Sequence, residues 1–293
     1  MQVAETQATA EGSVAIDERQ PTASDLSVVF FGDGEPKTPE SMLAQLQAAQ
    51  LEGGIAPDTY TLGGVVAALE QRCADMLGKE KAVFMPTGTL ANHLAIRRLC
   101  QSRPRAVVQE QSHLYNDTGD CVQRLSGLHL LPLGAGRPFF TLSELTEAVE
   151  RSNTGRVANP IGAVMLESPV RRQGGQVMPW SDIQALARFC TEQEIGTHLD
   201  GARLYMMSAA TGIGPEVYAA LFDTVYVSLY KYFGAPFGAI LAGSEEFCNG
   251  LYHDRRMFGA GLASSSFAAA LALRGINGFE ARFVQAMTKA TAL

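Results

Sequence analysis

The chain has 293 residues and a mass of 31.3 kDa, which allows one large domain or two, and either can bury a sizeable core. Hydrophobic residues make up 46% of it and charged residues only 18%, below the ~25% of an average soluble domain. This composition argues against disorder and predicts a globular protein. Because 23 basic residues face 30 acidic ones, the net charge of −7 disfavours a nonspecific binder of the nucleic-acid backbone.

Cysteine usage and apolar segments indicate the compartment. The cysteines are widely spaced and form no CxxC pair, so neither a disulfide framework nor a thiolate zinc site is indicated: Cys73, Cys100, Cys121, Cys190 and Cys248. The longest apolar stretch, residues 233–243, is far shorter than the ~20 residues needed to span a bilayer. The first residues lack the basic start and apolar segment of a secretory signal. We therefore expect a cytoplasmic protein without a membrane partner.

Helix-like and strand-like segments alternate from Thr38 to the end of the chain. Residues 61–78 carry apolar side chains at helical spacing and end at a glycine suited to a helix C-cap. The apolar run 81–85, the turn 86–89 and a second helical pattern predict a strand, a turn and a helix. Further strands are expected at residues 106–109, 128–131, 163–166, 197–199, 224–228 and 237–241. Helices are expected to begin at the capping boxes Thr141-x-x-Glu144 and Ser181-x-x-Gln184 and again after Asn277.

This alternation is typical of an α/β fold, and it predicts a three-layer, doubly wound, mostly parallel sheet with helices on both faces. We expect residues 1–25 to form a flexible tail, 26–60 an N-terminal arm and loop, 61–276 a large domain, and 277–293 the start of a C-terminal helix. Open sheets of this kind bind their ligands beyond the carboxyl ends of the strands.

Several strong catalytic motifs are missing from the sequence. It has no GxxxxGK[ST], no GxGxxG after a strand, no GxSxG and no HExxH, and its five histidines are scattered. Kinase-like, dinucleotide-binding, serine-hydrolase and zinc-dependent functions therefore lose their best support, and no metal site is expected. What remains is a set of single residues at predicted strand ends and tight turns.

Lys231 is the first of these residues. It is the only charged side chain between Asp223 and Glu245, and aromatic and small residues flank it. Most lysines are solvated surface groups. A lysine held in an apolar pocket loses its proton more easily, however, and becomes a candidate for a Schiff-base amine.

An acid and a turn complete the set. Asp200 directly follows the predicted strand 197–199, where it either caps the next helix or binds a ligand. The turn Thr87-Gly88-Thr89 begins a helix, and its amides and hydroxyls suit either an ordinary cap or an anion. Pyridoxal 5′-phosphate needs a lysine, a carboxylate for its ring nitrogen and a cradle for its phosphate. The three features together predict this cofactor.

Four segments in the same order resemble the threonine aldolase/aromatic amino acid β-eliminating lyase family: Asp58-Thr59-Tyr60, Lys79 to Asn92, His198 to Leu204, and Lys231 to Gly238. The resemblance runs from about Phe31 to the C-terminus. It implies the aspartate aminotransferase-like large domain of the fold-type I pyridoxal-phosphate enzymes, with the small C-terminal domain largely missing. It also implies a small amino-acid substrate and a homodimer or homotetramer.

The resemblance assigns a role to each of several residues. Thr87, Gly88, Thr89 and Ser228 would bind the cofactor, His113 would stack on its ring, Asp200 would pair with the ring nitrogen, and Lys231 would form the Schiff base. Arg203 and Glu167 would bind the substrate, and the catalytic set would be Lys231, Asp200, His113 and Tyr60. Tyr60 would enter the site of a neighbouring subunit. His113 is otherwise a bystander in a polar loop, and Arg203 a surface ion pair.

The sequence departs from the family pattern at four places. The usual Glu-Asn-Thr-His segment reads Glu167-Ser168-Pro169-Val170, so a valine replaces the histidine expected near the substrate hydroxyl. An Arg-Ser-Asp segment reads Phe31-Gly32-Asp33, the serine before the lysine is Tyr230, and residues 259–264 lack an arginine associated with the cofactor phosphate. The valine can neither form a hydrogen bond nor move a proton, so it weakens the case for aldol chemistry.

Three functions follow from these observations. The first is a pyridoxal-phosphate-dependent lyase that cleaves a β-hydroxy amino acid, as a threonine aldolase does, into glycine and an aldehyde, with a base that the sequence does not identify. The second is β-elimination from a β-substituted amino acid, which a valine at position 170 suits better. The third is a non-catalytic relative that acts as an oligomeric partner. Retention of Lys231, Asp200 and Arg203 together argues against the third.

Overall fold

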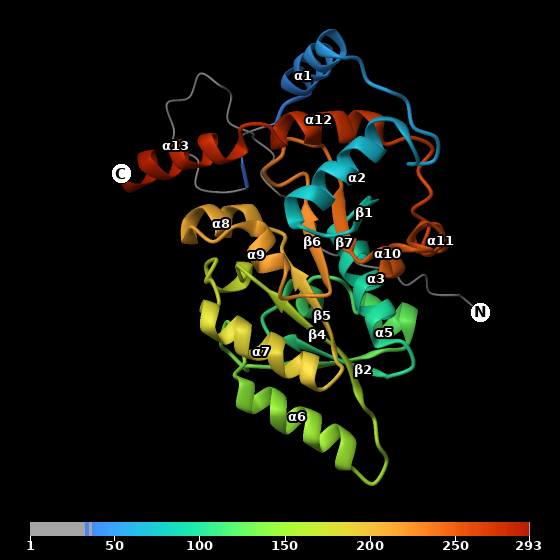
Figure 1. The fold of residues 1–293 in the computed structure, drawn as a ribbon, viewed down its shortest axis with the longest axis vertical. Coiled ribbons are helices and arrows are strands. Elements are labelled where there is room, and N and C mark those ends of the chain that lie inside the picture. The colour runs from blue at the N-terminus through green and yellow to red at the C-terminus, as the bar shows by residue number, and fades with distance from the viewer. Residues whose placement is uncertain (1–32, 35–36, 293) are drawn as a thin grey trace, which may run out of the picture. The chain divides into compact units, whose positions relative to one another are not determined.

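A computed structural model describes residues 33–34 and 37–292, so the expected tail and the Phe31 and Gly32 positions lie outside its described part. Its centre is one seven-stranded sheet in the order β1-β7-β6-β5-β4-β2-β3 (Figure 1). The strands are β1 (Lys81–Met85), β2 (Arg105–Gln109), β3 (His129–Leu133), β4 (Ile161–Glu167), β5 (Gly196–Asp200), β6 (Thr224–Ser228) and β7 (Ala239–Gly243). Each strand overlaps a predicted one, with ends shifted by up to two residues.

The sheet is mostly parallel, as predicted. Strands β3, β2, β4, β5 and β6 run parallel to one another, whereas β7 lies antiparallel to both β6 and β1. The reversal follows from the length of the connection, because residues 229–238 are too few to form the crossover that a parallel strand requires. The chain therefore turns back directly after β6, and Lys231 lies on this turn.

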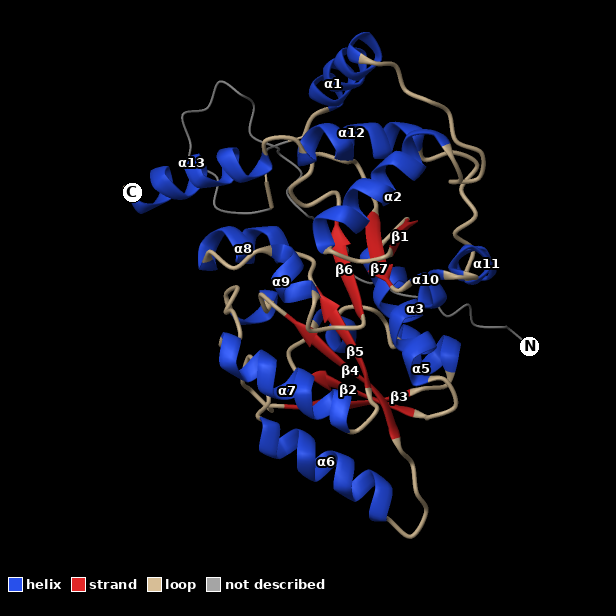
Figure 2. Cartoon of the chain, in the orientation of Figure 1, coloured by secondary structure: helices blue, strands red, loops and turns tan. Residues whose placement is uncertain are grey.

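Helices cover both faces of the sheet and complete the predicted three layers (Figure 2). One face packs against α2, α6, α7, α8 and α9, and the other against α3, α5 and α11. The helices are α1 (Pro39–Glu52), α2 (Gly64–Leu77), α3 (Gly88–Cys100), α4 (His113–Asn116), α5 (Cys121–Ser126), α6 (Leu142–Thr154), α7 (Trp180–Glu192), α8 (Leu204–Thr211), α9 (Pro215–Ala219), α10 (Glu245–Cys248), α11 (Leu251–Met257), α12 (Ser266–Ile276) and α13 (Phe279–Thr291). No helix in the described part of the chain is both long and apolar enough to cross a membrane.

Local sequence signals explain several helix ends. Gly78 follows α2 in a left-handed conformation, with φ of 60°, as the predicted C-cap requires. Thr141 and Glu144 form the predicted capping box of α6. The box predicted at Ser181 is wrong, because α7 begins at Trp180 directly after Pro179 and has no side-chain cap. The fixed backbone of Pro179 thus starts the helix one residue before the serine.

The C-terminal helix α13 forms as predicted, and it packs through Phe279. The Phe279 ring lies within 6.1 Å of the rings of Tyr205, Tyr232 and Phe233. Aromatic pairs at such distances add stabilisation beyond simple burial. Two of these rings, Tyr232 and Phe233, directly follow Lys231, so α13 packs against the turn that carries the lysine. The predicted domain boundaries remain predictions.

Candidate active site

Three adjacent parallel strands in the middle of the sheet place a row of polar side chains near their carboxyl ends. Glu167 ends β4, Asp200 ends β5, and the two are register partners, while Asp200 is in turn the register partner of Tyr226 on β6. Register partners in neighbouring parallel strands share a face of the sheet. All three line a cavity of about 340 Å³ at the carboxyl ends of the strands, where open α/β sheets bind ligands.

The amino end of α3 forms another wall of this cavity. Thr87 is its N-cap, and its Oγ1 accepts a hydrogen bond from the backbone N–H of Leu90 at 3.1 Å. Thr87, Gly88 and Thr89 all line the cavity. A Cβ atom at position 88 would lie 2.0 Å from the hydroxyl oxygen of Tyr226, so only glycine fits there. The first N–H groups of a helix have no partner within it, and together with the helix dipole they attract anions.

Lys231 reaches the same cavity from the turn between β6 and β7. The two ends of this turn are joined by a hydrogen bond from the Leu229 N–H to the Gly238 carbonyl at 3.1 Å. Burial lowers the pKa of Lys231 below its usual value, although the nearby Asp200 opposes the shift. A lysine with a lowered pKa has more of the neutral amine that attacks carbonyl carbon.

Asp200 is 2% exposed and accepts two hydrogen bonds. Its Oδ2 accepts from Asn92 Nδ2 at 2.6 Å, and its Oδ1 accepts from the backbone N–H of Ala202 at 3.1 Å. The Ala202 contact is a local turn at the end of β5 rather than the helix cap that the sequence suggested as an alternative, because α8 follows Arg203 and has no side-chain cap. Because Asp200 also lines the cavity, it combines that local role with access to a ligand.

Glu167 and His113 lie together in the same cavity. The Glu167 carboxylate accepts backbone hydrogen bonds from His113 at 2.6 Å and from Arg171 at 3.0 Å. Burial, with a smaller effect of the Asp200 charge, raises the pKa of Glu167 to about 7. Burial also lowers the pKa of His113, which favours a neutral ring. Glu167 is therefore able to exchange a proton near neutral pH.

Arg203 lines the cavity but already holds a carboxylate. Its Nε and Nη2 atoms donate to the two carboxylate oxygens of Asp33 at 2.6 and 2.8 Å, in a bidentate ion pair. The Nη1 atom has no hydrogen-bond partner among the residues that the structure describes, and remains for a second anion. Arg171 also borders the cavity, while its guanidinium pairs with Asp117 at 2.9 Å.

Two residues singled out from the sequence lie outside the lining. Ser228 is fully buried at the end of β6, and the structure does not place it on the cavity wall, where Tyr226 and Tyr230 lie instead. Val170 is also fully buried and forms an isolated bridge with Gln176 rather than facing the cavity. Neither side chain lines the cavity, and a cofactor contact of Ser228 remains a prediction.

Tyr60 lies on a surface loop, 47% exposed and away from the cavity of its own chain. The Asp58 carboxylate fixes this loop by accepting hydrogen bonds from the Ser264 hydroxyl, the Ser266 hydroxyl and the N–H groups of Ser265 and Thr61. The Tyr60 N–H also donates to the Ala263 carbonyl at 2.9 Å. The Tyr60 ring is thus held outward, with the Arg256 guanidinium 4.9 Å from its centre.

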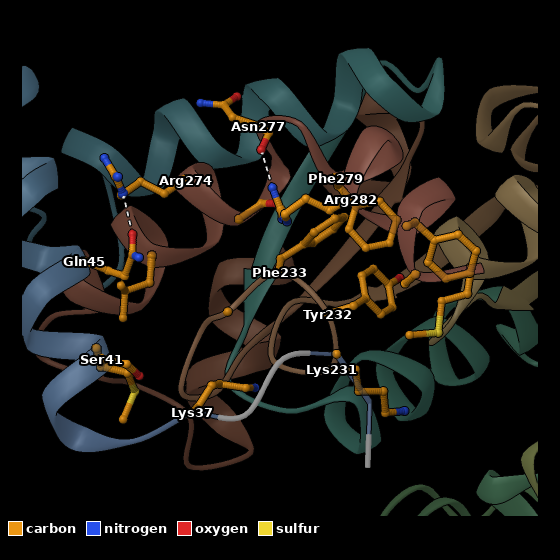
Figure 3. A pocket seen from close by; sticks show the side chains of 18 of the residues that line it. Lys37, Ser41, Gln45, Lys231, Tyr232, Phe233, Arg274, Asn277, Phe279 and Arg282 are labelled. Atoms are coloured by element: carbon orange, nitrogen blue, oxygen red, sulfur yellow. Dashed lines mark hydrogen bonds between the residues drawn. The ribbon is translucent and has the colours of Figure 1, made fainter. Parts of the chain in front are cut away.

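A larger groove of about 890 Å³ lies between α1, α12, α13 and the Lys231 turn. Figure 3 shows Arg274 donating to Gln45 and Arg282 donating to Asn277 along this groove. It shares Lys231 with the smaller cavity but contains neither Asp200 nor His113. The side chains best suited to catalysis therefore meet in the smaller cavity.

The sequence predicted most of the residues that meet in the cavity: Thr87, Gly88, Thr89, His113, Glu167, Asp200, Arg203 and Lys231. It missed Tyr226 and Arg171, and it treated Tyr230 only as a departure from the family pattern. Strand alternation could have pointed to Tyr226, because it lies two residues after Thr224 on a buried strand and so shares its face of the sheet. That signal becomes specific only when the register with Asp200 is known.

A family model of beta-eliminating lyases matches residues 36–293. The chain belongs to the beta-eliminating lyase family. Enzymes of the beta-eliminating lyase family are in general dependent on pyridoxal phosphate. The family resemblance seen in the four sequence segments is therefore confirmed, as are the α/β class and the mostly parallel sheet.

Relatives within and around the beta-eliminating lyase family include aldolases. The chain is 29% identical over 212 residues to the low-specificity L-threonine aldolase of Candida albicans, which covers 71% of this chain and 56% of the relative. It is 32% identical over 265 residues to aldolase vrtJ of Penicillium aethiopicum, covering 89% and 65%. The crystal structure of a candidate L-allo-threonine aldolase from Listeria monocytogenes EGD-E is 29% identical, with a TM-score of 0.78 over 87% of this chain and 68% of that one. The chain thus spans between half and about two thirds of the length of these relatives.

Proposed function

We propose that the chain is a pyridoxal-phosphate-dependent lyase that cleaves the Cα–Cβ bond of a β-hydroxy amino acid, giving glycine and an aldehyde. The observation that carries this proposal is the meeting of Lys231, Asp200 and the amino end of α3 in one cavity. The aldolases among the relatives support it.

The groups in the cavity fit pyridoxal phosphate in number and in chemistry. Lys231 offers a partly buried amine for its aldehyde, Asp200 a carboxylate for its ring nitrogen, and the N–H groups at Gly88 and Thr89 a cradle for its phosphate. His113 offers a flat ring beside these groups. When bound, the cofactor supplies an electron sink for the pair released as the Cα–Cβ bond breaks.

Side chains of the protein stabilise charge, bind the substrate and transfer the proton. Asp200 holds a proton on the ring nitrogen by presenting a negative charge to it. Arg203 binds the substrate carboxylate through the Nη1 side of its guanidinium, which Asp33 does not use. Glu167 accepts the proton of the β-hydroxyl group, because it lines the cavity and its pKa is raised to about 7. Glu167 thus takes the part of the base that the sequence did not identify.

A substrate panel tests the reaction type. The unmodified protein with added pyridoxal phosphate is assayed with β-hydroxy amino acids for glycine and aldehyde, and with β-substituted amino acids for pyruvate and ammonia. We expect glycine and aldehyde. Pyruvate and ammonia would replace the aldol reaction with β-elimination, and a protein that stays colourless with the cofactor would support a non-catalytic partner.

Replacing Glu167 with glutamine is expected to lower turnover of a β-hydroxy amino acid by about 100-fold, the usual contribution of a positioned general base. A base acts in its deprotonated form, so kcat/KM of the unmodified protein should rise as the pH increases through about 7. The Glu167→Gln variant should lack this rise. The pH dependence of kcat/KM between pH 5.5 and 9 measures both effects.

A matched control is Glu110→Gln, because Glu110 also accepts a backbone hydrogen bond, from Gly136 at 2.6 Å, but lies outside the cavity lining. Its kcat/KM and pH profile should stay close to those of the unmodified protein. If Glu167→Gln keeps the rise near pH 7, another group provides the base.

We further propose that the active unit is a homodimer or a larger assembly in which Tyr60 enters the cavity of a second copy. The rigid loop that holds Tyr60 outward supports this proposal. Mixing Lys231→Ala protein with Tyr60→Phe protein, under conditions of subunit exchange, should form hybrid dimers with one intact cavity. Activity should exceed that of either parent. If Tyr60→Phe alone is impaired and hybrids form, as native mass spectrometry would show, without a gain in activity, Tyr60 acts within its own chain.

A further inference from the structure

Three buried polar side chains lie behind Asp200, on the side away from the cavity. Asn92 comes from α3, His198 from β5 and Thr224 from β6, and each is 0% exposed. His198 is two residues before Asp200 on the same strand, so the two share a face, and His198 is the register partner of Thr224. Helix α3 covers this face of the sheet, which brings Asn92 between His198 and Asp200.

Hydrogen bonds join these side chains into one line. Asn92 Nδ2 donates to Asp200 Oδ2 at 2.6 Å, and Asn92 Oδ1 lies 2.9 Å from His198 Nε2. His198 Nδ1 lies 2.8 Å from Thr224 Oγ1. None of the three side chains lines the cavity, so none of them contacts a ligand directly.

The direction of each hydrogen bond follows from the carboxylate at its end. Because ionised Asp200 only accepts, Asn92 presents its NH2 group to Asp200 and its oxygen to His198. His198 Nε2 must then carry a hydrogen. Burial lowers the pKa of His198 to about 4, so the ring is neutral and its Nδ1 accepts from the Thr224 hydroxyl at 2.8 Å, a shorter contact than the 3.4 Å from that hydroxyl to the Thr197 carbonyl. Every donor in the line therefore points toward Asp200.

We propose that Asn92, His198 and Thr224 form a positioning relay that fixes the orientation of the Asp200 carboxylate. The relay has this consequence because Asp200 Oδ2 is held at the shortest contact of the line, 2.6 Å, by an amide whose own orientation is set by His198. A carboxylate fixed in this way would present its charge to the ring nitrogen of a bound cofactor and would favour a proton there. The relay rests on the proposed cofactor and deepens its assignment by naming what positions its carboxylate partner.

The experiment follows the protonation of the cofactor itself. Each protein is loaded with pyridoxal phosphate labelled with 15N in the ring, and the chemical shift of the ring nitrogen and the dissociation constant of the cofactor are measured. The relay variants are Asn92→Leu, His198→Leu and the milder Thr224→Val. His198→Gln tests for rescue, because its amide restores a donor toward Asn92. Thermal unfolding of each cofactor-free protein reports the structural effect separately.

The matched control is His93→Leu, which removes a different buried imidazole, one that lies on α3. His93 is 2% exposed, and its Nε2 lies 2.6 Å from Ser126 Oγ, outside the relay. This control imposes the stability cost of losing a buried histidine but leaves the contacts of Asp200 unchanged. It therefore distinguishes a relay from a general loosening of the fold.

In His198→Leu and Asn92→Leu we expect the ring-nitrogen resonance to move toward that of an unprotonated pyridine and the dissociation constant to rise by about tenfold. Thr224→Val should show a smaller shift, His198→Gln should recover most of it, and His93→Leu should keep the resonance of the unmodified protein. A resonance that stays unchanged in both leucine variants would overturn the relay while leaving the proposed function intact. An unmodified protein that binds no pyridoxal phosphate would overturn both.

Discussion

Replacing Lys231 with alanine is expected to abolish covalent attachment of pyridoxal phosphate and to reduce lyase activity to the background of the assay. Among the five lysines of the chain, Lys231 lines the cavity that also holds Asp200 and the amino end of α3. Its partly buried amine is the nucleophile that we propose for the cofactor aldehyde, and its pKa is lowered by burial. Borohydride reduction of loaded protein, followed by peptide mapping, should place the pyridoxyl label on Lys231 alone.

Lys79 provides the matched control for this experiment. Burial lowers its pKa as well, and its Nζ donates to the Phe222 carbonyl at 2.5 Å, but it lies outside the cavity. The Lys79→Ala variant should keep both the label on Lys231 and the activity. A label on Lys79, or on any other lysine of the unmodified protein, would contradict the assignment of the cavity.

Replacing Asp200 with asparagine is expected to lower turnover by at least about 100-fold while the cofactor still binds, the size of effect that loss of one preorganised electrostatic partner produces. The amide keeps much of the shape and the acceptor oxygen of the side chain, but it has no charge to hold a proton on the ring nitrogen. The loss should fall on kcat rather than on KM, because the charge acts mainly in the transition state. Steady-state kinetics and cofactor titration separate the two quantities.

Asp223→Asn tests whether any loss of a strand-end carboxylate has the same effect. Asp223 precedes β6 and accepts hydrogen bonds from the Thr197 N–H at 2.7 Å and the Thr197 hydroxyl at 3.0 Å, at the amino end of the strands and away from the cavity. Its replacement should reduce stability without lowering kcat. Turnover near that of the unmodified protein in Asp200→Asn would limit Asp200 to a structural role through its hydrogen bonds with Asn92 and Ala202.

Sequence reasoning succeeded where the signal is local. The isolation of Lys231, the acid that ends the strand before Gly201 and the turn Thr87-Gly88-Thr89 are each readable within a few residues, and the structure brings all three into one cavity. The strands were found for the same reason, because buried strands have continuous apolar runs. The predicted box at Ser181 failed because Pro179, a neighbour outside the motif, starts the helix earlier.

Other features depend on contacts that no local pattern encodes. The register that aligns Glu167, Asp200 and Tyr226 is set by three strands far apart in the chain. The contact of Asn92 with His198 likewise requires α3 to lie across β5. The ion pair of Arg203 with Asp33 spans 170 positions, so the sequence could identify the arginine but not the carboxylate that holds it.

The loop that carries Tyr60 holds two residues other than glycine in the left-handed region, Tyr60 with φ of 53° and Thr61 with φ of 62°. Such conformations cost about 1–3 kcal/mol each and persist only where their surroundings enforce them. Burial alone would raise the pKa of Asp58, but its hydrogen bonds to Thr61 and to residues 264–266 bring that pKa below its ordinary value. Stabilisation from a group with a depressed pKa is present above its unfolded-state pKa and is lost only as the pH falls through the folded-state one. The hydrogen bonds of the Asp58 carboxylate therefore hold the strained backbone of this loop in place. We expect the loop to keep its conformation across the neutral range and to relax only in acid, which hydrogen exchange of residues 58–62 at decreasing pH would detect.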